Sequence, residues 1–76
     1  MKQTTINEFL TEREIAHCTR LFNISRDKPH TLAKSICEEV IKPSLNRINR
    51  TLGQQNDPMY LAYAVEYALT MASKQR

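Results

Sequence analysis

Turn-forming residues are scarce in this sequence. Its 76 residues include a single glycine, Gly53, and only three prolines. So few residues suited to tight turns leave little room for β-hairpins and favour long helices. A chain of this length forms one domain at most, and such small domains bury only about 60% of their unfolded surface. Because the resulting core is marginal, lone helical domains of this size often dimerise.

Long apolar runs are also missing. No stretch reaches the roughly 18 consecutive apolar residues of a transmembrane helix, so we expect no membrane-spanning segment. The opening residues MKQTTINEF contain no apolar segment that resembles a signal peptide. There are only two cysteines, Cys18 and Cys37. Together these features predict a cytoplasmic protein whose two cysteines are free thiols.

Neither sign of charge dominates. Eleven basic residues face eight acidic ones, for a net charge of +3, and the two signs are mixed along the chain. A dedicated nucleic-acid-binding domain usually carries a denser basic stripe. The charge therefore permits an acidic partner without requiring one. A hydrophobic fraction of 41% beside a charged fraction of 25% is typical of a folded domain and argues against disorder.

The apolar periodicity predicts a single all-α domain, residues 1–76, of three or four helices. Thr11 and Glu14 match the capping-box pattern and predict a helix over 11–22. Asp57 before Pro58 predicts the start of a second helix over 58–73. Residues 1–10 form either an arm or a short turn, and the sequence does not decide between them.

Residues 29–52 are expected to form one kinked helix or two helices. Apolar residues up to Val40 repeat every four positions, but those from Ile41 onward follow a face that does not coincide with the first. A helix must bend near Pro43, because the ring clashes with the carbonyl four residues earlier. Gly53 is a good residue to end this segment. The predicted core consists of Ile15, Cys18, Leu21, Phe22, Leu32, Ile36, Val40, Ile41, Leu45, Ile48, Leu52, Leu61, Val65 and Leu69.

The last predicted helix, with the sequence MYLAYAVEYALTMA, is apolar around nearly its whole circumference. Such a helix is buried on more than one side. One stripe is enough to pack against the rest of the chain. The other either caps the edge of the core with its tyrosines or forms an interface, for which tyrosine is well suited. We expect an interface, with a second copy in a homodimer or with another protein. Its candidate residues are Tyr60, Tyr63, Ala64, Tyr67 and Met71.

An alternative function comes from VIKPSLNRINR, residues 40–50, whose pattern suggests the second half of a helix-turn-helix. Asparagine and arginine are the residue types that read adenine and guanine edges in the major groove. The turn of such a motif would hold Glu38 and Glu39, whose charges repel phosphate, and this weakens the interpretation. A weaker variant is binding of an acidic partner through Arg13, His17 and Arg20. The candidate residues of a DNA-binding regulator are Lys42, Asn46, Arg47, Asn49 and Arg50.

No catalytic residue, cofactor or metal site is predicted, and no small-molecule substrate is expected. A single glycine leaves no glycine-rich phosphate loop. The soft metal ligands His17, Cys18, His30 and Cys37 do not show the spacing of a zinc site. We therefore predict a non-enzymatic interaction module that acts as an accessory or adaptor protein.

Overall fold

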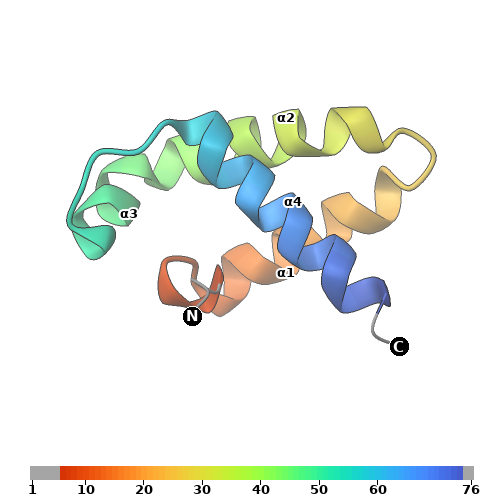
Figure 1. Cartoon of the computed structure of the whole chain (residues 1–76), viewed down its shortest axis with the longest axis horizontal. Helices are drawn as coiled ribbons and strands as arrows, with labels where there is room; N and C mark the ends of the chain where they lie inside the picture. The colour runs from red at the N-terminus through yellow and green to blue at the C-terminus, as the bar shows by residue number, and fades with distance from the viewer. Residues whose placement is uncertain (1–5, 75–76) are drawn as a thin grey trace.

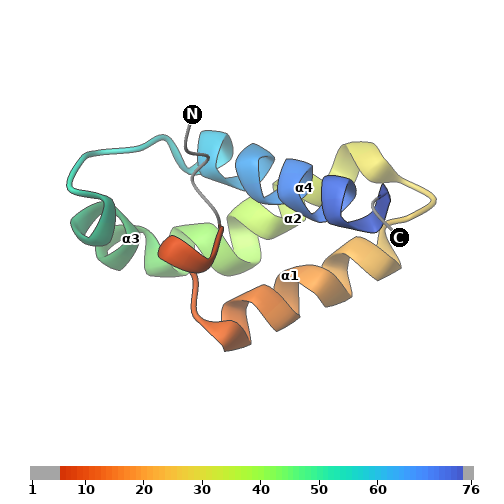
Figure 2. The ribbon, with the colours of Figure 1, turned by 60° about the horizontal axis from the view of Figure 1, so that its bottom comes forward.

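The computed structural model describes residues 6–74, and this part of the chain is all-α, without strands. Helix α4 lies across α1 and α2 on one face of the molecule (Figures 1 and 2). None of the helices in these residues is both long and apolar enough to cross a membrane. The elements in chain order are the 3-10 turn η1 (Ile6–Glu8), α1 (Glu12–Ile24), the 3-10 turn η2 (Pro29–Thr31), α2 (Leu32–Ile36), the π-turn η3 (Cys37–Ile41), the 3-10 turn η4 (Lys42–Ser44), α3 (Leu45–Leu52) and α4 (Pro58–Lys74).

Helix α1 begins with the predicted capping box. The Thr11 hydroxyl accepts a hydrogen bond from the Glu14 amide at 3.2 Å, and the Thr11 amide donates to Glu14 Oε1 at 2.9 Å. These two bonds satisfy amides that have no partner within the helix. The helix continues two residues beyond the predicted end at Phe22, to Ile24.

The backbone is helical without interruption from residue 29 to residue 52, but its helix type changes around Pro43. Proline cannot donate the hydrogen bond that an α-helix needs at this position. The chain instead makes a wide π-turn, in which the Lys42 amide donates to the Cys37 carbonyl, and then a tight 3-10 turn through Pro43. Val40 and Ile41, where the apolar face changes in the sequence, both lie in this wide turn and are buried.

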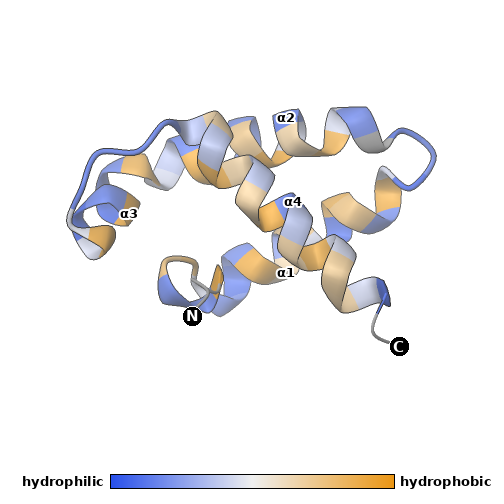
Figure 3. Cartoon of the chain, in the orientation of Figure 1, coloured by the Kyte–Doolittle hydropathy of each residue, from blue (hydrophilic) through white to orange (hydrophobic). Residues whose placement is uncertain are grey.

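The connection from α3 to α4 is bounded by the two residues that the sequence predicted to end one helix and to start the next. Gly53 ends α3 with a left-handed φ of 75°, and its amide donates to the Asn49 carbonyl at 2.8 Å. Helix α4 begins at Pro58, and the Leu61 amide donates to the Asp57 carbonyl at 3.2 Å. Figure 3 shows this polar connection in blue before the more apolar α4.

The core lies between α1, α2, η3 and the inner side of α4. Five of the predicted core residues are only partly buried, although they pack against it. Phe9 and Leu10 are 5% exposed, so residues 6–10 fold onto the body, while residues 1–5 of the expected arm lie outside the described part of the chain. Sequence periodicity missed Phe9, Leu10, Ala33, Cys37 and Ala62. The partly buried predicted residues are Ile15, Phe22, Leu45, Leu52 and Leu69.

Candidate interaction surface on helix α4

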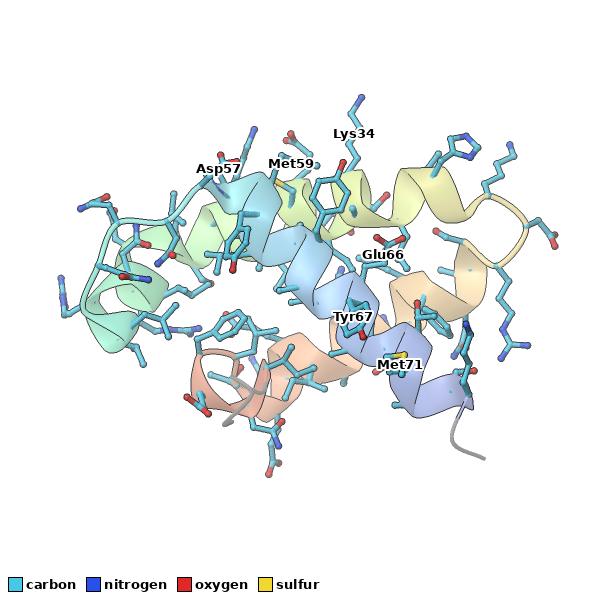
Figure 4. The ribbon with its side chains drawn as sticks, in the orientation of Figure 1. Lys34, Asp57, Met59, Glu66, Tyr67 and Met71 are labelled. Atoms are coloured by element: carbon cyan, nitrogen blue, oxygen red, sulfur yellow. The ribbon has the colours of Figure 1, made fainter. Side chains whose placement is uncertain are left out.

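Helix α4 has one buried side and one exposed side, and both are apolar. Leu61, Ala62 and Val65 are buried against the other helices. The tyrosines on the other side are largely in solvent, with 65% of Tyr60, 57% of Tyr63 and 62% of Tyr67 exposed. Figure 4 shows the outward side of the helix, with Tyr67 and Met71 labelled on it. The α4 face is defined here as Tyr60, Tyr63, Ala64, Tyr67 and Met71, all of which are exposed.

The α4 face is continuous because of the spacing of its members. At about 100° per residue, Tyr60, Ala64, Tyr67 and Met71 project within about 40° of one line along the helix, and Tyr63 lies about 60° from that line. Val65 points to the opposite side. The same helix therefore supplies the core from one side and an aromatic surface from the other.

The centre of the α4 face carries no charge. Three tyrosines that are each more than half exposed leave roughly 300–400 Å² of aromatic side chain in water. The largest apolar patch on a typical monomer has about this size and is often functional. Tyrosine and methionine are enriched at interfaces, while charged residues are depleted from their centres. A partner on this face stays a prediction.

The basic segment around Pro43 is organised differently from the expected DNA-reading surface. Arg47 donates through Nη2 to Glu14 Oε1 at 2.7 Å and through Nη1 to Glu14 Oε2 at 3.1 Å, and Nη2 also reaches the Phe9 carbonyl at 2.9 Å. The Ser44 hydroxyl donates to Glu14 Oε2 at 2.7 Å. Arg47 therefore ties α3 to the start of α1 and to the N-terminal turn.

The Glu14 carboxylate is strongly stabilised in its charged form. Partial burial by itself raises the pKa of a carboxyl group, but the hydrogen bonds from Arg47 and Ser44 and from the Thr11 amide outweigh it. Together with the positive charge of Arg47, they lower the pKa of Glu14 from 4.5 to about 2. Only 17% of this side chain is exposed, which makes the cluster a structural feature rather than a free ionic surface.

Two further candidates of the DNA-binding set also have partners within the chain. Asn49 is buried, and its Oδ1 accepts from the amide of Asn56 at 3.0 Å and from Asn56 Nδ2 at 3.2 Å. Lys42 donates to Glu38 Oε2 at 2.9 Å on the surface. Asn46 and Arg50 are exposed and line a shallow polar hollow beside Gly53. The five candidates therefore do not form one free surface.

The soft metal ligands do not converge. Burial, followed by the charge of Glu14, raises the pKa of Cys18 to about 11, and burial also raises the pKa of Cys37. Both are free thiols and are protonated at neutral pH, which makes them unreactive. His17 Nε2 lies 3.0 Å from Glu39 Oε1. Within residues 6–74 no three His, Cys, Asp or Glu side chains are grouped to hold a metal.

No known protein family, curated protein or solved structure matches this chain. Two features of the described residues stand out by their geometry: the α4 face, and the cluster of Glu14, Ser44 and Arg47. The first is apolar, exposed and on a helix that packs against α1, α2 and η3. The second joins α3 to the start of α1, since Ser44 and Arg47 both donate to Glu14.

Proposed function

We propose that this protein is a non-enzymatic interaction module that forms a homodimer through the α4 face and serves as an accessory or adaptor protein. The observation that carries the proposal is the exposure of three tyrosines on the side of α4 opposite to its buried residues. A small helical domain gains core volume by covering such a face. Tyrosine also provides a large contact area at a small cost in conformational entropy.

The rest of the fold gives the α4 face a firm support. Helix α4 packs against α2 and the π-turn, and also against α1. We interpret residues 29–52 as one helix bent at Pro43, because no loop interrupts it. In this interpretation the bend places both α2 and the π-turn beneath α4. A rigid support favours a defined interface, since less order has to be gained on binding.

The proposal places the protein in the cytoplasm, where Cys18 and Cys37 stay reduced. It does not include a nucleic-acid role, because Arg47 and Asn49 are bound within the chain. Reading base edges would require these two side chains to leave their partners, and no other observation favours DNA as a ligand.

Light scattering of the purified protein over a range of concentrations tests the dimer. We expect the mass to rise from that of one chain toward twice that value. Ala64→Glu places a charge in the centre of the α4 face and should lower the association constant at least tenfold, because an unpaired buried charge costs several kcal/mol. Tyr63→Glu should have a similar effect while helicity by circular dichroism is retained.

Ala16→Glu on α1 is the matched control, since Ala16 is also an exposed alanine within a helix. It should dimerise like the unmodified chain. A protein that stays monomeric at all concentrations contradicts the proposal. So does an Ala64→Glu variant that associates as well as the Ala16→Glu control.

A further inference from the structure

We infer that two copies of the chain pair with their α4 helices antiparallel, about a two-fold axis near Ala64 and Tyr67. This inference rests on the proposed function, the homodimer through the α4 face. In this register Tyr60 of one subunit lies against Met71 of the other. The occupant of the α4 face is then a second copy of the chain rather than a different protein.

The charges at the two ends of the α4 face carry this inference. Asp57 precedes the first residue of α4 and Lys74 is its last. Both are exposed, and the hydrogen bonds and ion pairs found among residues 6–74 do not involve either side chain. A helix of this length spans roughly 25 Å. The apolar face is thus bounded by a negative charge at one end and a positive charge at the other.

Only one orientation of two such faces brings opposite charges together. In an antiparallel pair, Asp57 of each subunit lies near Lys74 of the other, and the helix dipoles also run in opposite directions. A parallel pair would place like charges together at both ends. A two-fold interface is self-complementary, so each favourable contact occurs twice.

The register follows from the extent of the apolar face. Placing Tyr60 opposite Met71 covers the whole face in both copies, whereas a shift by one helical turn would leave an aromatic ring in water. Sulfur–aromatic contacts are favourable, and the small Ala64 leaves room for Tyr67 of the other subunit. With about 400–500 Å² from each face plus its charged rim, the pair buries about 1,000 Å², the minimum for a specific interface.

Disulfide cross-linking tests the orientation separately from the dimer itself. Tyr60→Cys and Met71→Cys chains carrying different tags are mixed and oxidised, and the native chain, whose two cysteines are buried, shows the background. We expect the 60–71 cross-link to exceed both the 60–60 and the 71–71 products severalfold. Predominant 60–60 and 71–71 products would overturn the antiparallel arrangement and leave the dimer standing. A native chain that light scattering finds monomeric would overturn both.

Charge reversal provides a second test that leaves the apolar residues intact. Asp57→Lys and Lys74→Asp should each raise the dimer dissociation constant severalfold at low salt, because each creates like-charge contacts at both ends of the antiparallel pair. The double variant should restore the original value. In a parallel pair neither single change would weaken association, so single variants that dimerise like the native chain contradict the arrangement.

Discussion

Arg47 and Glu14, 33 residues apart in the sequence, form a two-pronged ion pair with contacts of 2.7 and 3.1 Å. The pair joins the first turn of α1 to the first turn of α3. Glu14 also closes the capping box of its own helix. One carboxylate thus fixes both the start of α1 and its position relative to α3, and a bidentate geometry of this kind needs arginine rather than lysine.

Replacing Arg47 should destabilise the fold. We expect Arg47→Ala to lower the free energy of unfolding by about 2–3 kcal/mol, because Glu14 and the Phe9 carbonyl lose charge-assisted hydrogen bonds. Urea denaturation followed by circular dichroism measures this loss. Arg50→Ala is the control, since Arg50 lies on the same helix and takes no part in the ion pairs found among residues 6–74. Equal stabilities for the two variants would show that the ion pair contributes nothing.

Stability should fall as the solution is acidified. The pKa of Glu14 is lowered in the folded state, so its contribution is fully present above its unfolded value of 4.5 and is lost as the pH falls toward about 2. A difference of this size corresponds to roughly 3 kcal/mol as an upper limit. Urea midpoints measured from neutral pH down to the acid range should reveal this decline.

Glu14→Gln provides the comparison for the acid prediction. This variant keeps a side-chain oxygen but cannot titrate, so it should be less stable at neutral pH and its stability should change less between pH 4.5 and 2. Parallel pH profiles for the variant and the native chain would assign the acid loss to other carboxylates.

Asn49 should be needed for the connection between α3 and α4. Its side chain accepts two hydrogen bonds from Asn56 within a partly buried site. Asn49→Ala leaves these donors unpaired and should cost about 1–2 kcal/mol of unfolding free energy. Asn46→Ala, on the same helix but exposed, should be close to neutral. Thermal unfolding of both variants checks the difference, and an equal midpoint would contradict the assigned role.

Local signals in the sequence predicted the helix ends well. The Thr11 capping box, Gly53 at the end of α3 and Pro58 at the start of α4 all stand where the residues indicated. Each of these signals acts over three or four residues, so neighbouring residues in the sequence are enough to recognise it. The all-α class was predicted separately, from the helical spacing of the apolar residues.

Contacts between distant residues could not be predicted in this way. The sequence names Arg47 and Asn49 as candidates for binding DNA, because helical spacing gives the direction of a side chain but not what lies across from it. Their partners come from α1 and from the loop before α4. Periodicity also gave no position for Phe9, because its segment is too short to show a repeating apolar pattern. In the structure Phe9 is buried in the core.

The wide turn at Cys37–Ile41 lies between α2 and α3 and contributes to how these two helices are rotated relative to each other. It holds one more residue than an α-turn would, and the tight 3-10 turn Lys42–Ser44 follows it directly. The two turns together set the direction in which the Arg47 side chain leaves α3, toward Glu14 and the Phe9 carbonyl. Both the salt link and the seating of α3 therefore depend on a local irregularity of the backbone.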